Sequence, residues 1–236
     1  MTISVTPIFI PGLILTREIF AAQIDGLVHP AAAKTADTLG RDSITAMAEA
    51  ALALADGPLV PVGISMGGYI AMEMARLAPQ RLAGIALLNT QHRADPPERR
   101  KQREATIDMA QNDRFRGVTR HLLKSFLSPT AMEDETLVAR VIAMAQEVGR
   151  ENFVLQQRAI LGRRDQSDTL GALTVPALVL GGGLDTLTPP QTSRDMAELI
   201  SDAELVIMEE IGHLSTIEAP DEVTDILNAY LARLAA

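Results

Sequence analysis

The feature that most constrains the fold is a series of short apolar segments, each followed directly by turn-forming or polar residues. Six ranges have this character: 8–10, 27–29, 59–64, 82–88, 175–180 and 205–208. Apolar runs of this length are typical of strands buried on both faces, as in a parallel sheet. Stretches with helical periodicity lie between them, for example 43–55, 67–77 and 191–199. The alternation predicts an α/β chain with a doubly wound, mostly parallel sheet.

This alternation is interrupted over residues 95–168, where no segment resembles a strand. The block contains four amphipathic stretches, at 96–110, 115–126, 133–148 and 151–161, and Gly149 is a predicted break between the last two. Both flanks of the block look like strands of the same sheet. We therefore interpret 95–168 as a helical cap, or lid, inserted into a core formed by 1–94 and 169–236, which suits a chain of 236 residues.

Composition excludes several classes of protein. The formal net charge of −9 disfavours a nucleic-acid partner, whose phosphates need clustered Lys and Arg. The absence of Cys excludes disulfides, thiolate zinc sites and a Cys nucleophile, and it is compatible with the cytoplasm, where we expect the protein. The apolar N-terminal segment has no basic residue before Arg17, so we interpret it as a core strand and not as a signal peptide. No apolar run is long enough to predict a membrane span.

Basic residues cluster near the start of the predicted cap, between acidic neighbours. The cluster is Arg99, Arg100, Lys101 and Arg103, and Glu98 and Glu104 flank it. Charges of both signs along one helix are typical of a face in contact with solvent. We therefore expect a solvated helix surface here.

The range 63–68 has the sequence Gly-Ile-Ser-Met-Gly-Gly, and it follows an apolar strand and opens a helix. This is the context of a Gly-x-Ser-x-Gly nucleophile elbow, with Ser65 as the nucleophile. The sharp turn strains the serine backbone and exposes its hydroxyl, and side chains at the flanking positions would meet backbone. The alternative is a turn that only packs or binds phosphate. The sequence contains no P-loop. It also lacks a complete Gly-x-Gly-x-x-Gly motif, because Thr186 stands where a third glycine would have to follow Gly181 and Gly183.

A serine needs a base to become a good nucleophile, and His213 is the best candidate. It follows Gly212 just past the last predicted strand, where a strand-end loop can carry it over the sheet. The three other histidines have weaker contexts. They are His29, which ends an early predicted strand and is a candidate pocket residue, His92 at the start of the cap, and His121 in a cap helix.

Asp185 is the best candidate for the acid that orients the histidine. It follows the strand-like run that ends in three glycines, at the sheet edge where open α/β sheets carry their sites. The order Ser65, Asp185, His213 is the chain order expected when the nucleophile sits on such an elbow. Asp185 is alternatively a turn or helix-cap residue. The fallback acids are Asp195, Glu209 and Glu218.

Acyl transfer also needs two hydrogen-bond donors for the oxyanion of the tetrahedral intermediate. The backbone N–H of Met66, the residue after the serine, is the expected first donor. The second should come from the loop after the first strand, most simply the N–H of Leu13, since Gly12 allows close approach. An ordinary Pro-Gly turn is the alternative for this loop.

Together these motifs resemble the α/β-hydrolase superfamily over nearly the whole chain. The matching residues are Pro11-Gly12, Gly63 to Gly68, Asp185 with Pro189, and Gly212-His213 with Glu218-Ala219-Pro220. The chain is most similar to small bacterial members described as esterases or lactonases, in which a helical cap follows the strand after the nucleophile helix. Two positions differ from many relatives. Pro11 replaces a His in the oxyanion loop, and Ile64 replaces a His directly before the nucleophile. The two N-terminal strands of larger relatives are not seen, so we expect about six strands.

The resemblance implies hydrolysis of a small carboxylic ester or lactone through an acyl-Ser65 intermediate, with no cofactor and no metal. We expect a mainly apolar pocket that favours an acyl group without strong charge. Its predicted lining is Gly12, Leu13, Ile14, His29, Met66, Phe115, Phe126 and Met144. The same three residues also serve C–C bond hydrolysis, thioester hydrolysis, acyl transfer or perhydrolysis, and a non-catalytic binding protein of this fold is a further alternative. The sequence does not indicate an oligomeric state.

Overall fold

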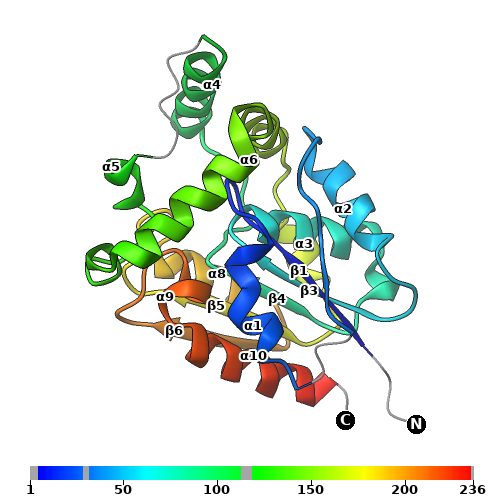
Figure 1. The fold of residues 1–236 in the computed structure, drawn as a ribbon. Coiled ribbons are helices and arrows are strands. Elements are labelled where there is room, and N and C mark those ends of the chain that lie inside the picture. The colour runs from blue at the N-terminus through cyan, green and yellow to red at the C-terminus, as the bar shows by residue number, and fades with distance from the viewer. Residues whose placement is uncertain (1–4, 29–31, 113–118, 235–236) are drawn as a thin grey trace.

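The computed structural model describes residues 5–28, 32–112 and 119–234 of the chain. Its centre is a six-stranded sheet in the order β2-β1-β3-β4-β5-β6, in which every neighbouring pair is parallel (Figure 1). The strands are β1 (Thr6–Ile10), β2 (Lys34–Thr35), β3 (Leu59–Ile64), β4 (Ile85–Leu88), β5 (Ala177–Gly182) and β6 (Ala203–Met208). The doubly wound parallel sheet predicted from the apolar runs is confirmed.

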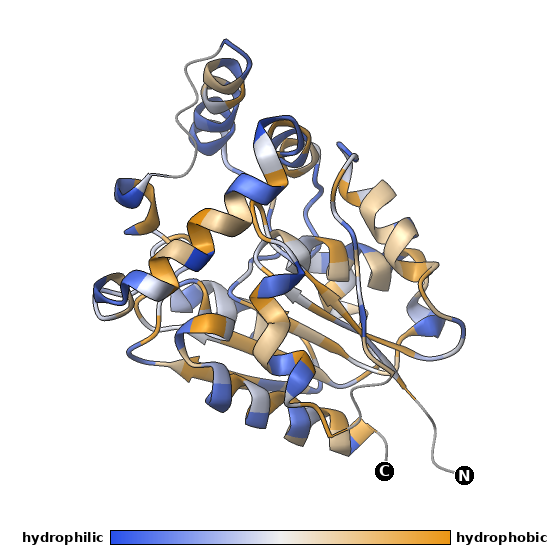
Figure 2. Ribbon diagram, viewed as in Figure 1, coloured by the Kyte–Doolittle hydropathy of each residue, from blue (hydrophilic) through white to orange (hydrophobic). Residues whose placement is uncertain are grey.

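Helices cover both faces of this sheet, so each strand sends alternate side chains into two separate apolar clusters. Ile85 and Leu87 of β4 belong to one cluster, and Ala86 and Leu88 to the other. The first face is covered by α2 (Ile44–Leu52), α3 (Met66–Leu77), α7 (Ser167–Gly171) and α8 (Pro190–Leu199). The second is covered by α1 (Ala21–Asp25) and α10 (Pro220–Leu234). Burial on both faces explains the continuous apolar runs, which Figure 2 shows as apolar strands at the centre.

The predicted strand at 27–29 is wrong. Its first two residues follow α1, which ends at Asp25 and is capped by Gly26, and His29 lies outside the described residues. Val28 donates its backbone N–H to the side chain of Asn228 in α10 and not to a neighbouring strand. The edge of the sheet is instead the two-residue strand β2, which is too short and too polar to produce an apolar signal.

The segment between β4 and β5 is helical, as expected from the missing strands. It contains α4 (Pro97–Gln111), α5 (Arg120–Leu123), a 3₁₀ turn η4 (Ala131–Glu133) and α6 (Glu135–Leu161), and α7 follows. Gly149 breaks α6 with φ 72° and ψ 167°, a conformation that favours glycine. In Figure 1, α4 and α5 stand well away from the sheet, and α6 lies between α4 and the strands. The division into a core and a cap stays an interpretation.

The remaining short elements complete the connections around the sheet. They are the 3₁₀ turns η1 (Arg17–Phe20) and η3 (Pro79–Arg81) and the single helical turn α9 (Ser215–Glu218). Among the helices of the described ranges, none combines the length and the apolar composition that crossing a bilayer requires.

Candidate active site

Ser65 lies between the last residue of β3 and the first residue of α3, at the carboxyl edge of the sheet. Its backbone has φ 55° and ψ −117°, a left-handed conformation that is costly for a residue with a side chain. The glycines around it permit this turn. A Cβ atom on Gly63 would meet the carbonyl of Gly67, and one on Gly67 would meet the carbonyl of Ile10. The strand, the turn and the helix therefore pack at distances that only glycine allows.

His213 connects the serine to a buried carboxylate. Its Nε2 atom lies 2.9 Å from Ser65 Oγ, and its Nδ1 atom lies 2.7 Å from Asp185 Oδ2. With the Nδ1 proton donated to the carboxylate, Nε2 is left as the acceptor for the serine hydroxyl. The Phe126 ring packs against the imidazole in a T-shaped arrangement, and the backbone N–H of His213 donates to the Phe126 carbonyl. The imidazole is thereby held from two sides.

Asp185 is held by neutral donors as well as by the histidine. The backbone N–H groups of Leu187 and Thr188 donate to Oδ1 at 2.8 and 2.9 Å, and the Thr188 hydroxyl donates to Oδ2 at 2.6 Å. Burial opposes ionisation of the carboxyl group, but the charge of His213 and these hydrogen bonds lower the pKa of Asp185 below its ordinary value. The group therefore stays a carboxylate next to the imidazole.

Two polar residues at the end of β4 also support this arrangement. Buried Asn89, with φ 43°, donates to Asp185 Oδ2 at 3.2 Å and to the Gly212 carbonyl at 3.1 Å, and it accepts from Ser215. The next residue, Thr90, donates its hydroxyl to the Ser65 carbonyl at 2.7 Å. We did not single them out from the sequence. Their position could have indicated this role, because they follow β4, and β4 lies between β3, which leads to Ser65, and β5, which leads to Asp185.

Glu218 does not contact the imidazole, although it was a fallback acid. Its carboxylate accepts the backbone N–H groups of Gly212, Leu214 and Ser128 at 3.0 to 3.1 Å. It thus ties the histidine loop to the segment that carries Phe126. Asp195, another fallback acid, accepts a hydrogen bond from Gln191 at 2.8 Å and lies 3.8 Å from Arg93.

The loop after β1 lies directly against the serine. A Cβ atom on Gly12 would come within 3.2 Å of Ser65 Cβ, so this loop approaches as closely as the sequence suggested. Ile14 has φ 60°, and its N–H donates to Gln156 Oε1 of α6 at 3.0 Å. No local pattern predicts this restraint, because 142 residues separate the two groups. Oxyanion donors at Leu13 and Met66 stay a prediction.

A cavity of about 310 Å³ opens at Ser65 and His213. Leu13, Ile14 and Phe126 line it, as predicted, together with Tyr69, Leu122, Ser125, Phe153, Gln157, Ile160, Leu187 and Thr188. Gly12 backs the serine, Met66 is fully buried, and neither is part of the lining, contrary to the prediction. Met144 is a correction, because it faces the apolar cluster beneath α6, where it is 2% exposed, and does not line the cavity. His29 and Phe115 lie outside the described residues.

Most of the surface that lines the cavity is apolar, as expected, but the wall formed by α4 is polar. Arg99, Gln102, Arg103 and Thr106 all line the cavity. The prediction that the basic cluster forms a solvated helix surface is therefore correct for only two of its four residues. Arg100 and Lys101 are exposed, but Arg99 and Arg103 are half-buried and turn toward the cavity. Sequence patterning does not separate these cases, because a polar stripe has the same appearance whether it faces bulk water or a cavity.

Asp95 stands behind this wall as a buried counterion. It accepts from Arg103 Nε at 2.5 Å and from Arg163 at 2.9 Å, and Arg103 also donates to Gln157 at 2.6 Å. Burial opposes ionisation, but the hydrogen bond from Arg163 and the charge of Arg103 lower the pKa of Asp95 to about 2. Arg163 in turn stacks over the Tyr69 ring at 4.4 Å. Arg103 is thus fixed in place on the cavity wall.

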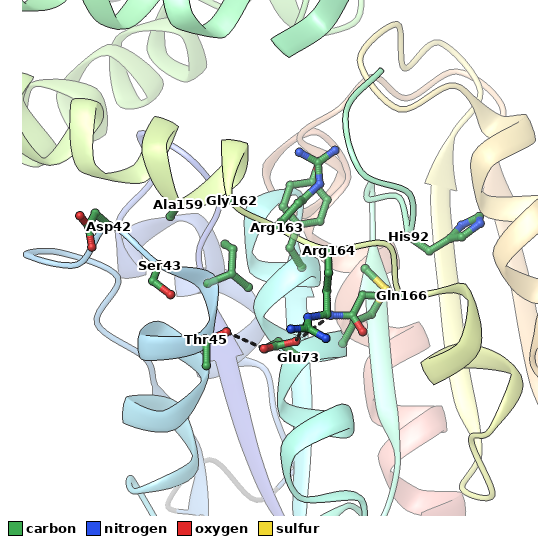
Figure 3. Close-up of a pocket in the computed structure, with 13 residues that line it drawn as sticks. Asp42, Ser43, Thr45, Glu73, His92, Ala159, Gly162, Arg163, Arg164 and Gln166 are labelled. Atoms are coloured by element: carbon green, nitrogen blue, oxygen red, sulfur yellow. Dashed lines mark hydrogen bonds and ion pairs between the residues drawn. The ribbon is translucent and has the colours of Figure 1, made fainter. Parts of the chain in front are cut away.

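A smaller cavity, of about 140 Å³, lies beside α2 and α3 around the buried Glu73 (Figure 3). Glu73 accepts two hydrogen bonds from Arg76 and one each from Thr45 and Gln166. Burial opposes ionisation, but these donors lower the pKa of Glu73 to about 2. The carboxylate joins two helices and the segment after α6, so we assign it a structural role. Across the described residues, no group of three or more His, Asp or Glu is arranged to hold a metal ion.

A family model described as the alpha/beta hydrolase fold matches residues 41–220. The chain belongs to this family. Among curated relatives, the dihydrolipoyllysine-residue acetyltransferase component of an acetoin cleaving system from Pseudomonas putida is 27% identical over 94% of this chain, which spans 58% of that protein. A pimeloyl-[acyl-carrier protein] methyl ester esterase from Photobacterium profundum is 29% identical over 82% of this chain and 78% of its own length.

Solved structures share the same α/β-hydrolase architecture. An esterase from Thermogutta terrifontis superposes with a TM-score of 0.90 at 24% identity, covering 100% of this chain and 92% of the other. An enol-lactonase from Burkholderia xenovorans gives 0.81 at 22% identity, covering 97% and 92%. At these identities the likeness shows the fold.

Proposed function

We propose that this chain is a serine hydrolase that cleaves a small carboxylic ester or lactone through an acyl-enzyme on Ser65. The observation that carries the proposal is the continuous hydrogen-bonded path from Asp185 through His213 to the Ser65 hydroxyl, at 2.7 and 2.9 Å. The path ends in a cavity of substrate size. Curated relatives named as methyl ester esterases support this chemistry over the other reactions of the fold.

In the first half of the reaction, Ser65 Oγ attacks the ester carbonyl while His213 Nε2 takes the hydroxyl proton. Asp185 keeps the imidazole in the required tautomer and stabilises the imidazolium. The N–H groups of Met66 and Leu13 are the proposed donors to the oxyanion. The C–O bond then breaks, and His213 returns the proton to the leaving alkoxide, which departs as the alcohol.

In the second half, water attacks the acyl-Ser65 carbonyl and gives its proton to His213. Collapse of the intermediate releases the carboxylic acid and returns the proton to Ser65. For a lactone the alcohol stays attached to the acyl group, so a hydroxy acid is the only product. Every step uses this chain's own residues and water.

Replacing Ser65 by alanine tests the proposal. With short 4-nitrophenyl esters, we expect kcat/KM of Ser65→Ala to fall by at least about 10⁴-fold, because the nucleophile is removed while binding is kept. Mass spectrometry should place a fluorophosphonate adduct on Ser65 of the parent protein. The exposed Ser201→Ala variant is the matched control and should retain full activity. Retained activity or labelling in Ser65→Ala would refute the assignment.

A further inference from the structure

The cavity contains a polar stripe that ester cleavage by itself does not need. Arg99, Gln102, Arg103 and Thr106 follow the i, i+3, i+4, i+7 spacing of one helical face, and all four line the cavity. A helix that only shields a site from water is expected to present an apolar stripe inward. Ile107 and Ala110 of α4 meet that expectation on the face that packs into the core. The cavity-facing stripe is therefore a second face with a different task.

The charge on this wall is unbalanced. None of the described residues that line the cavity is an Asp or Glu. Within the part of the chain that the structure describes, Arg99 makes no ion pair or hydrogen bond through its side chain, while Arg103 shares the single carboxylate of Asp95 with Arg163. Arg99, Arg103 and Arg163 together with Asp95 give a local net charge of +2. The net charge of the whole chain is −9.

Two guanidinium groups four residues apart on one helix face repel each other. An anion between them removes this repulsion. The planar fork of arginine matches a carboxylate in a bidentate manner, and Arg103 is already oriented by Asp95 and Gln157. Arg99, which is half-buried at the cavity, has its donors available for such a partner.

We propose that Arg99 and Arg103 bind a carboxylate on the acyl part of the substrate, which is an ester or lactone of a dicarboxylic acid. This inference rests on the proposed function. Ser65 and His213 lie at the sheet edge and α4 lies away from it (Figure 1), so the carboxylate binds at the cap side of the cavity. Apolar Leu122, Phe126 and Phe153 line the rest, which suits an aliphatic spacer between the carboxylate and the reacting carbonyl.

A matched pair of esters tests the inference. One is 4-nitrophenyl hydrogen adipate, with a free carboxylate at the end of the acyl chain, and the other is neutral 4-nitrophenyl hexanoate of the same length. The quantity measured is the ratio of their kcat/KM values. We expect the parent protein to favour the adipate ester, and the ratio to fall with added salt because screening weakens the charge contact. In Arg99→Gln the ratio should fall about tenfold.

The control variant is Lys101→Gln, which removes the same charge from an exposed position of the same helix outside the cavity. Its ratio should stay within about twofold of the parent value. Fluorophosphonate labelling of Ser65 in Arg99→Gln verifies that the variant is folded. A parent ratio below one, or equal ratios in the two variants, overturns the inference. If neither ester is cleaved and Ser65 is not labelled, the proposed function itself has failed.

Discussion

Asp185 and Asp95 are two buried carboxylates that each orient one side chain on a wall of the same cavity, and they do so in different ways. Asp185 orients His213 at the sheet edge and is itself fixed by nearby backbone and hydroxyl donors of Leu187 and Thr188. Asp95 orients Arg103 on the cap wall and is fixed by Arg163, which lies 68 residues further along the chain.

The difference indicates which wall of the cavity is formed by local motifs of the fold and which depends on long-range packing. The sheet-edge wall depends on a strand end and the turn that follows, so it forms wherever these local motifs form. The cap wall depends on α4 packing against α6, and on Asp95, which precedes α4, meeting Arg163, which follows α6. We therefore assign the proposed chemistry to the first wall and the proposed substrate preference to the second.

The largest expected effect comes from the sheet-edge carboxylate. Asp185→Asn keeps the side-chain volume but favours the wrong imidazole tautomer, so kcat should fall by about 10⁴-fold for both adipate and hexanoate esters. Steady-state kinetics at saturating substrate measure this loss. Asp195→Asn, at the fallback acid, is the control and should stay near the parent rate. A small effect of Asp185→Asn would remove Asp185 from the proposed triad.

The cap-wall carboxylate should affect stability more than chemistry. Asp95→Asn leaves Arg103 and the 3% exposed Arg163 side chain without a counterion, so the free energy of unfolding at pH 7 should fall by about 3 kcal/mol. Urea denaturation measures it, with exposed Asp108→Asn as the matched control. Equal stability of the two variants would contradict the importance of this buried pair.

The Asp95 carboxylate should also make the free energy of unfolding depend on pH in the acid range. The pKa of Asp95 is lowered from 3.8 to about 2, so its stabilisation is present above pH 3.8 and is lost as the pH falls through 2. The parent protein should lose about 2 kcal/mol of unfolding free energy from this group by pH 2, and Asp95→Asn should not. Parallel stability curves for the two proteins would show that Asp95 does not titrate in this way.

Asn89 should have a smaller effect that is confined to the sheet-edge wall. Asn89→Ala removes the donor to Asp185 and to the Gly212 carbonyl, so the histidine loop is held less firmly. We expect kcat to fall about tenfold for both esters while KM and the adipate-to-hexanoate ratio stay nearly constant. A change in KM alone, or in the ratio, would place Asn89 in substrate binding instead.

The smallest effect should come from adding a charge to the cap wall. Gln102→Glu introduces a carboxylate into the stripe that contains Arg99 and Arg103, so the adipate-to-hexanoate ratio should fall about threefold. Gln111→Glu, at the exposed end of the same helix, is the control. An unchanged ratio in Gln102→Glu would separate this part of α4 from substrate recognition.

The sequence determined those parts of the molecule that depend on neighbouring residues. Strands buried on both faces appear as apolar runs, so most of the sheet was predictable, and the glycine turn at Ser65 follows from local steric limits. Placing Asp185 and Gly212-His213 after strands was enough to expect them at one edge, because parallel strands all end there. A break at Gly149 followed from a single glycine between helical stretches.

Only the tertiary structure decided how distant segments meet. The apolar pair Leu27-Val28 resembles the start of a strand, yet it follows a helix, and the true edge strand β2 has no apolar signal. Asn89 and Gln156 acquire their partners across 96 and 142 residues, which no local pattern encodes. Helix rotation turned Met144 into the core and Arg99 toward the cavity. Periodicity defines a polar or an apolar stripe on a helix, but the surface that the stripe faces depends on long-range packing.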